Sequence, residues 1–264
     1  MKRIFASLVL LALICCTPNN PSTQNPSQPA PSNPQNPPSN PQPVPAPTPI
    51  PTPPAPAHVA LSWENTTSPH PERAPWSDAL IAQITKRFDR LDLASDLPIF
   101  CPTYTSLPQT SRIKAWAELM VADAYYESGY NQTEADVDVG TPDNKDSWSI
   151  GLWQISVDDQ DWVGEDFKIS GQYKYNYDQL LTGTDNADLA MAIMARQIVN
   201  KGVVAIPAGV TGIYWSTLHP GGKYDQTDNI VTRVKKNVPE CQSAQAIIRH
   251  NKRFARGSAE PHGI

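Results

Sequence analysis

The sequence predicts a mainly helical fold, and three observations support this. Segments 77–93, 110–129 and 185–202 carry apolar side chains three and four positions apart, which is the spacing of one helix face. Two of these segments end at a glycine, the residue that commonly follows the last turn of a helix. Strand signals are few, and the short run 203–206 predicts no more than an edge strand. We therefore expect a compact helical domain around one buried helix.

Each of the three helices has its own signals. The first is expected to begin at Ser77, whose side chain would cap it, and the second at Thr110 or Ser111. The second is expected to end at Gly129. The third, 185–202, is apolar on several sides, which is typical of a helix buried in a core. We expect this third helix to be the central one.

The N-terminus has the composition of an export signal. Two basic residues precede the apolar run 4–14, which is too short to span a bilayer. The run ends in Leu13-Ile14-Cys15-Cys16, which resembles a bacterial lipobox. We therefore interpret 1–15 as a lipoprotein signal peptide and Cys16 as the lipidated residue. The alternative is an ordinary cleaved signal followed by an accidental cysteine pair.

A proline-rich linker, 16–57, follows the signal. The segment 17–57 holds 17 of the 28 prolines and no Lys, Arg, Asp or Glu. Such a segment has too few apolar groups to fold, so we expect a disordered, extended tether with a reach on the order of 100 Å. The tether either lets the domain act at a distance from its membrane or is a spacer with no required reach.

The remaining segment, 58–264, is long enough for one folded domain. Its two cysteines, Cys101 and Cys241, are expected to form a disulfide in an exported protein; two buried thiols are the alternative. The net charge of −5 gives no reason to expect nucleic acid as a partner. The five histidines are scattered, so no metal site is expected, and no cofactor is implied.

One carboxylate stands out in this domain. Glu127 lies in the last predicted turn before Gly129, at the end of an apolar stripe and one helical turn after Asp123. Partial burial and a neighbouring carboxylate would both raise the pKa of Glu127, and a general acid needs such a pKa. A glutamate at a helix end is also common on solvated surfaces, so this position alone does not decide between the two readings.

The surrounding motifs favour the interpretation of Glu127 as a catalytic general acid. "ESGY" at 127–130, followed by "SIGLWQIS" at 149–156, resembles two motifs of the lytic transglycosylase and lysozyme superfamily. Trp153 stands where that family usually has Met. A third element, "VTGIYWSTLHPGG", supplies Tyr214 at the position of a family tyrosine, with Trp215 in place of Asn. The resemblance covers roughly 110–220 and implies an α+β lysozyme-like fold with a substrate cleft.

The resemblance also implies a reaction. Glu127 would act as general acid and base on the β-1,4 bond between N-acetylmuramic acid and N-acetylglucosamine of peptidoglycan, giving a 1,6-anhydro product by lytic transglycosylation. Ser128 and Gln154 would bond the substrate or the loop beside Glu127, and Tyr214 would orient Glu127. Gly151 would let the backbone approach the sugar. Trp153 is expected either to pack in the core or to stack on a sugar.

The stretch 127–165 is strongly acidic, with ten carboxylates and one lysine. A solvated loop is the simplest interpretation. Alternatively, Asp138 or Asp146 holds a water opposite Glu127, which would make the protein a hydrolytic lysozyme. An acidic cleft would also suit deacetylated glycan, because that glycan carries amines.

We expect a monomer whose partners are peptidoglycan strands and, through the lipid anchor, a membrane. The expected location is the periplasmic face of a bacterial membrane, the outer membrane by analogy, or elsewhere in the cell envelope. Two alternatives remain: a catalytically inactive peptidoglycan-binding protein of the same fold, and an unrelated helical lipoprotein. The residues before 110, including Trp63, Glu64 and Trp76, would cover the cleft or only pack.

Overall fold

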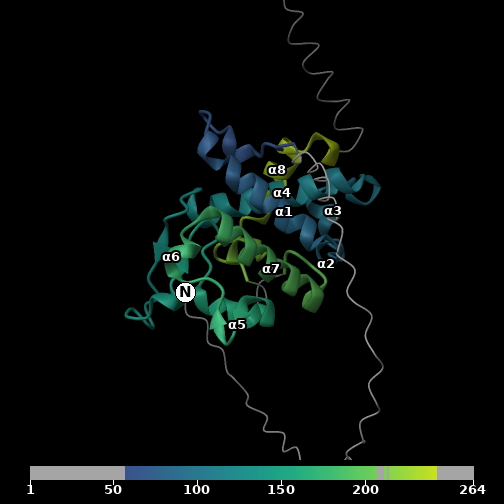
Figure 1. Ribbon diagram of the computed structural model, residues 1–264. Helices are drawn as coiled ribbons and strands as arrows, with labels where there is room; N and C mark the ends of the chain where they lie inside the picture. The colour runs from purple at the N-terminus through teal and green to yellow at the C-terminus, as the bar shows by residue number, and fades with distance from the viewer. Residues whose placement is uncertain (1–56, 207–210, 213, 243–264) are drawn as a thin grey trace, which may run out of the picture. The chain divides into compact units, whose positions relative to one another are not determined.

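The computed structural model describes residues 57–206, 211–212 and 214–242 (Figure 1). The predicted signal peptide 1–15, the lipidation site Cys16 and the linker up to residue 56 lie outside the described residues. None of the described helices is both long and apolar enough to cross a membrane. The helices are α1 (Ala74–Lys86), α2 (Phe88–Leu91), α3 (Leu97–Phe100), α4 (Gln109–Ser128), α5 (Gln160–Val163), α6 (Tyr177–Leu180), α7 (Gly183–Lys201) and α8 (Thr227–Asn237).

The central helix is α7, as the sequence predicts. Thirteen of its 19 residues are buried, and α1, α2, α5 and α6 all contact it (Figure 1). It begins at the cap Thr182 and ends before Gly202, which adopts a left-handed conformation with φ of 73°. Because α7 is covered on several sides, apolar residues occur around most of its circumference.

A second core helix, α4, carries the predicted acid. Ten consecutive residues, from Ala115 to Ala124, are buried, and α4 contacts α1 and α8 together with the 3₁₀ helices η1 (Ser62–Glu64) and η7 (Ser216–Leu218). Gly129 ends α4 in the left-handed conformation, with φ of 63°, as predicted. These contacts bury the middle of α4 and leave both of its ends outside the core.

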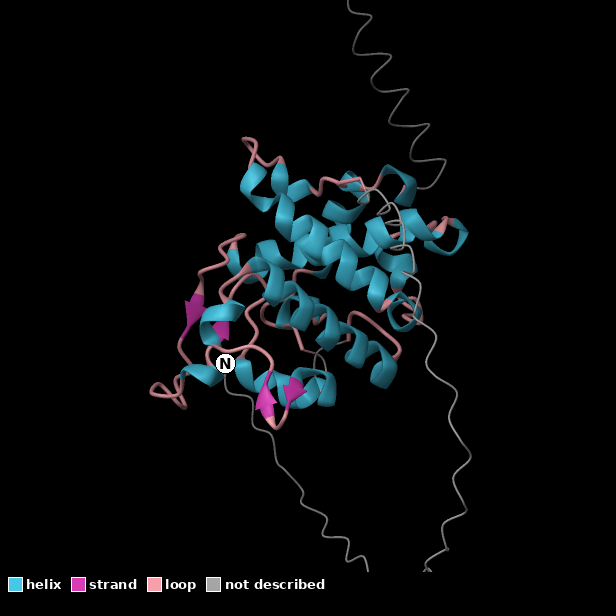
Figure 2. Cartoon of the chain, viewed as in Figure 1, coloured by secondary structure: helices cyan, strands magenta, loops and turns pink. Residues whose placement is uncertain are grey.

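Strands are short and few in the described part of the chain, so helix dominates the fold (Figure 2). Two antiparallel pairs lie between α4 and α6. They are β1 (Ala135–Asp136) with β2 (Ser149–Ile150), and β3 (Lys168–Ile169) with β4 (Gln172–Tyr173). The edge strand predicted at 203–206 is wrong. The side chain of Asp96 instead accepts the backbone N–H groups of Val204 and Ala205, so this segment needs no neighbouring strand.

Two predicted helix starts are also wrong. α1 begins at Ala74 with a proline in its first turn, and Ser77 lies inside the helix. The Ser77 hydroxyl accepts from the Trp63 indole at 2.7 Å and donates to Glu64. α4 begins at Gln109, one residue before the nearer predicted cap. Trp63, Glu64 and Trp76 are buried, so they pack within the domain.

The predicted disulfide is confirmed. Cys101 follows α3, Cys241 follows α8, and their sulfur atoms are bonded, 140 positions apart in sequence. In the chain-entropy model a closed loop of this length stabilises the folded state by about 5 kcal/mol. The bridge fixes the end of α8, the helix that packs against α4.

Candidate active site

The candidate site is built around the last turn of α4. Glu127 is half-buried, one residue before the end of the helix, and the N–H of Gly129 donates to the carbonyl of Tyr125 at 3.0 Å. Because Gly129 turns the chain away at once, the Glu127 side chain is carried on the rigid end of a core helix. A rigid support of this kind is what a positioned acid requires.

A buried aspartate lies one turn before Glu127. Asp123 is fully buried, and its Oδ1 lies 2.6 Å from the Thr217 hydroxyl oxygen. The same hydroxyl lies 2.9 Å from Oε1 of Glu127. Burial and the charge of Glu127 raise the pKa of Asp123 well above its usual range, while the contact with Thr217 opposes the shift. η7 therefore links two carboxyl groups of α4 through one hydroxyl.

The segment 149–156 forms a tight loop beside this helix end. Gly151 has φ of 74° and Gln154 has φ of 49°. Asn186 of α7 holds the loop: its side chain accepts the Trp153 N–H at 3.0 Å and donates to the carbonyls of Ile150 and Leu180. Because Asn186 is fully buried, these bonds replace water and fix the loop to the central helix.

Gly151 has no room for a side chain. A Cβ at this position would lie 2.5 Å from Nδ2 of Asn186 and 2.6 Å from the carbonyl oxygen of Leu180. The missing side chain therefore makes room for the protein's own core; that Gly151 lets the backbone approach a sugar stays a prediction. Trp153 is fully buried, and its indole donates to the carbonyl of Met120 at 2.9 Å. Of the two predictions for Trp153, core packing is confirmed and sugar stacking is wrong.

Ser128 joins the two motifs. Its hydroxyl lies 3.0 Å from the carbonyl of Leu152 and 3.2 Å from that of Ala124, so it connects the end of α4 with the loop. Of the two predicted partners of Ser128, the structure shows the loop; a bond to the substrate stays a prediction. Gln154 donates from Nε2 to the carbonyl of Gly151 at 2.9 Å. Its Oε1 is buried and has no hydrogen-bond partner among the described residues, so it is an available acceptor.

Tyr214 is buried beside the same loop. Its ring stacks on Trp162, with centroids 6.2 Å apart, and its hydroxyl donates to Asp159. Asp159 also accepts the N–H and the hydroxyl of Ser156, at 2.7 and 2.8 Å. The structure thus connects Tyr214 to the end of the 149–156 loop. That Tyr214 orients Glu127 stays a prediction.

The two predicted water-positioning residues lie in the long loop after α4. Asp138 is half-exposed and accepts from the N–H of Gly140 and the hydroxyl of Thr141, both at 2.9 Å, which lowers its pKa. Asp146 is exposed, and its charge adds to the effect of burial in raising the pKa of Asp158. A water held by either residue stays a prediction.

Three further residues of the candidate site were not assigned a role from the sequence: Thr217, Asn186 and Asp159. Thr217 lies 90 positions from Glu127, and no spacing rule connects the two. Asn186 had one usable signal, since a polar residue in an otherwise apolar helix needs partners. Within the described residues, no group of three or more His, Cys, Asp or Glu side chains is placed to hold a metal ion.

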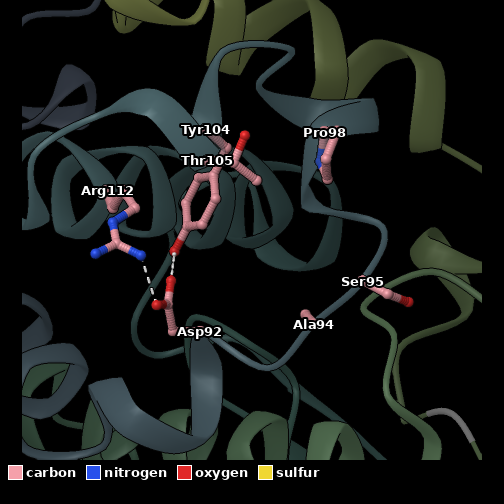
Figure 3. A pocket seen from close by; sticks show the side chains of 7 residues that line it. All are labelled: Asp92, Ala94, Ser95, Pro98, Tyr104, Thr105 and Arg112. Carbon is pink, nitrogen blue, oxygen red and sulfur yellow. Dashed lines mark hydrogen bonds and ion pairs between the residues drawn. The ribbon is translucent and has the colours of Figure 1, made fainter.

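A separate cavity of about 280 Å³ lies near the start of α4 (Figure 3). Asp92 in it accepts from the Tyr104 hydroxyl at 2.7 Å and from Arg112 at 2.5 Å. Arg112 and Glu127 are 15 residues apart on one helix, which corresponds to roughly 22 Å along its axis. This cavity is therefore not part of the site around Glu127. Its lining residues are Asp92, Ala94, Ser95, Pro98, Tyr104, Thr105 and Arg112.

No protein-family model matches the chain, and no curated protein matches it. Among solved structures, the chain is similar to wild-type DslA (Bd0314) from Bdellovibrio, with 25% identity and a TM-score of 0.53, covering 70% of this chain and 100% of that one. Two DslA structures in which a glutamate is replaced by glutamine match over the same shares, at 23% and 24% identity and TM-scores of 0.54 and 0.53. The similarity confirms a mainly helical fold of the lysozyme-like type.

Proposed function

We propose that this chain cleaves the β-1,4 bond between N-acetylmuramic acid and N-acetylglucosamine in peptidoglycan, with Glu127 as general acid and base. The observation that carries the proposal is the contact between the two motifs. The Ser128 hydroxyl reaches the carbonyl of Leu152 at 3.0 Å, so the acid-bearing helix end and the 149–156 loop form one site. The lysozyme-like fold supports the same assignment.

Glu127 would first donate a proton to the bridging sugar oxygen as the glycosidic bond breaks. The ring carbon then develops positive charge, and the acetamido group of the substrate would stabilise it. Glu127, now a carboxylate, would accept the proton of the muramoyl 6-hydroxyl as that oxygen bonds to the ring carbon. The product would be a 1,6-anhydro sugar, so a single protein carboxylate suffices. This is the transglycosylase outcome that the motifs imply.

Hydrolysis is the second candidate, and the acidic loop favours it. In an inverting hydrolase, a second carboxylate deprotonates water on the opposite side of the sugar. Asp138 is half-exposed and ionised at neutral pH, because its hydrogen bonds lower its pKa. It would supply that base. On deacetylated muramate, which lacks acetamido assistance, this carboxylate would be needed most.

The test is product analysis with the full-length chain on purified peptidoglycan, acetylated and deacetylated. Mass spectrometry distinguishes anhydro ends, expected from transglycosylation, from reducing ends, expected from hydrolysis. Glu127→Gln should lower kcat by about 10²- to 10⁴-fold, because a placed acid contributes that much. Asp138→Asn should abolish reducing ends only if hydrolysis operates.

The matched control is Glu240→Gln, the same chemical change at an exposed residue next to the disulfide. It should cleave glycan at the wild-type rate. If wild type and Glu127→Gln bind peptidoglycan equally and neither releases fragments, the chain is a binding protein and the proposed reaction is wrong.

A further inference from the structure

One hydroxyl lies between two carboxyl groups in the candidate site. Oγ1 of Thr217 is 2.6 Å from Oδ1 of Asp123 and 2.9 Å from Oε1 of Glu127. A threonine hydroxyl has one proton, so it can donate to only one of them. Both contacts are hydrogen bonds only if one carboxyl group is itself protonated and donates to Thr217. The geometry therefore requires a proton on Asp123 or Glu127.

Burial assigns that proton to Asp123. Asp123 is fully buried, its Oδ2 has no hydrogen-bond partner, and no cation contacts it among the described residues. An ionised carboxylate in such a place would lose its hydration without compensation. Glu127 is half-buried and retains contact with solvent.

In the part of the chain that the structure describes, the elements around α4 bring no cation into contact with Asp123. η7 brings Thr217, and α8 brings Arg233, whose guanidinium lies 3.7 Å from the centre of the Tyr125 ring and donates to the Tyr126 hydroxyl. The charged group that acts on Asp123 is Glu127, from the same helix, and its charge is also negative. A neutral Asp123 removes the repulsion between the two.

We propose that Asp123 is a positioning residue: as a neutral acid it donates to Thr217, and Thr217 donates to Oε1 of Glu127. The inference rests on the proposed function of Glu127. Asp123 keeps its own proton throughout, so the orientation of Thr217 does not change when Glu127 alternates between acid and base.

The test is a set of four variants of the full-length chain, assayed for kcat and KM across pH. Asp123→Ala and Thr217→Val should each lower kcat at least about tenfold and leave KM nearly unchanged, since they remove an orientation and not a substrate contact. Asp123→Asn should recover most of the loss, because its amide N–H donates to Thr217 as the acid does. Thr217→Ser, which keeps the hydroxyl, should recover likewise.

The pH profile adds a readout that mere packing would not change. In wild type the alkaline limb of kcat/KM reports a coupled pair of carboxyl groups, whereas Asp123→Asn should show a single ionisation. Two results would overturn the inference: wild-type kcat and profile in Asp123→Ala and Thr217→Val, or an Asp123→Asn variant as inactive as Glu127→Gln. The second result would mean that the Asp123 proton is itself transferred.

An infrared difference spectrum separates this inference from the proposed function. Wild type minus Asp123→Asn at neutral pH should show the carbonyl band of a protonated carboxylic acid, whether or not the chain cleaves glycan. A missing band overturns the inference even if cleavage is observed. A band without cleavage supports the position of the proton and contradicts the proposed reaction.

Discussion

Two buried aspartates on the two core helices have opposite environments. Asp188 of α7 accepts from Arg87 at 2.6 Å and from Lys174 and Tyr175 at 2.7 Å. Burial alone would raise the pKa of Asp188, but these donors and the Arg87 charge lower it overall. Asp123 of α4 has one hydroxyl partner and a carboxylate neighbour, and its pKa is raised.

This difference indicates that Asp188 stabilises the fold, whereas Asp123 belongs to the candidate active site. Asp188 is ionised and joins α7 to Arg87, just after α1, and to Lys174, just before α6, so it serves the scaffold. Asp123 contributes no comparable attraction, and burying it without a cation costs stability. Groups with unfavourable electrostatics concentrate at functional sites, where the surrounding fold maintains them. Asp188, with its two ion pairs, thus identifies a part of the molecule that stabilises the fold. Asp123, which has no ion pair among the described residues, identifies the candidate active site.

The largest expected effect on the free energy of unfolding comes from replacing Asp188. Asp188→Asn leaves the Arg87 guanidinium without its counter-charge in a buried position. We expect the free energy of unfolding to fall by about 4 kcal/mol, the range for breaking a buried ion pair from one side. Urea unfolding monitored by circular dichroism measures this. Because the folded pKa of Asp188 is lowered, its contribution is present above pH 4 and is lost as pH falls through the folded pKa.

Asp178→Asn is the matched control for this variant. Asp178 is exposed on α6, so the same chemical change should alter the free energy of unfolding by no more than about 0.5 kcal/mol. A loss under 1 kcal/mol for Asp188→Asn would mean that the ion pairs on α7 do not support the fold, and the contrast between the two aspartates would fail.

A smaller loss of stability is expected from replacing Gly151, where the loop 149–156 packs against α7. Gly151→Ala would force a Cβ against Asn186 at a residue with positive φ. Overpacking and the left-handed backbone together should lower the free energy of unfolding by about 3 kcal/mol. Gly129→Ala has similar φ, 63°, and no atom within 4 Å of the new Cβ, so it should cost only about 1 kcal/mol. Equal losses would show that the contact with Asn186 is unimportant.

Local signals explain which features the sequence predicts. The helix ends at Gly129 and Gly202 follow from glycine's access to positive φ, and the buried nature of α7 follows from its apolar pattern. Cys101 and Cys241 are the two cysteines of the segment 58–264, so the predicted bridge had one possible pairing. Each of these predictions depends on residue type and nearby sequence alone.

Contacts between distant segments explain the failures. Ser77 has the character of a cap, yet its hydroxyl serves Glu64 and Trp63 inside the fold. The packing of Gly151 against Asn186, 35 positions away, was likewise not predicted. Asp123 was noted only as a like charge beside Glu127, because the hydroxyl that connects them comes from Thr217. No periodicity predicts such contacts, since tertiary packing creates them.

The smallest expected effect is a gain in stability when Asp123 of the candidate site is replaced. Asp123→Asn removes a buried ionisable group, and at pH 7 we expect the free energy of unfolding to rise by about 1 kcal/mol. The sign follows from linkage: since the folded pKa of Asp123 is raised, its favourable contribution is complete below the unfolded pKa, near pH 4, and is lost as pH rises through the folded pKa. The gain of the variant should therefore grow from pH 4 upward, a window in which Asp188→Asn shows a constant loss. Urea unfolding of both variants and wild type at several pH values measures the two dependences. A gain in stability that is independent of pH would show that Asp123 is ionised in the folded protein. Asp123 and Asp188 would then differ in their hydrogen-bond and ion-pair partners, but not in their charge.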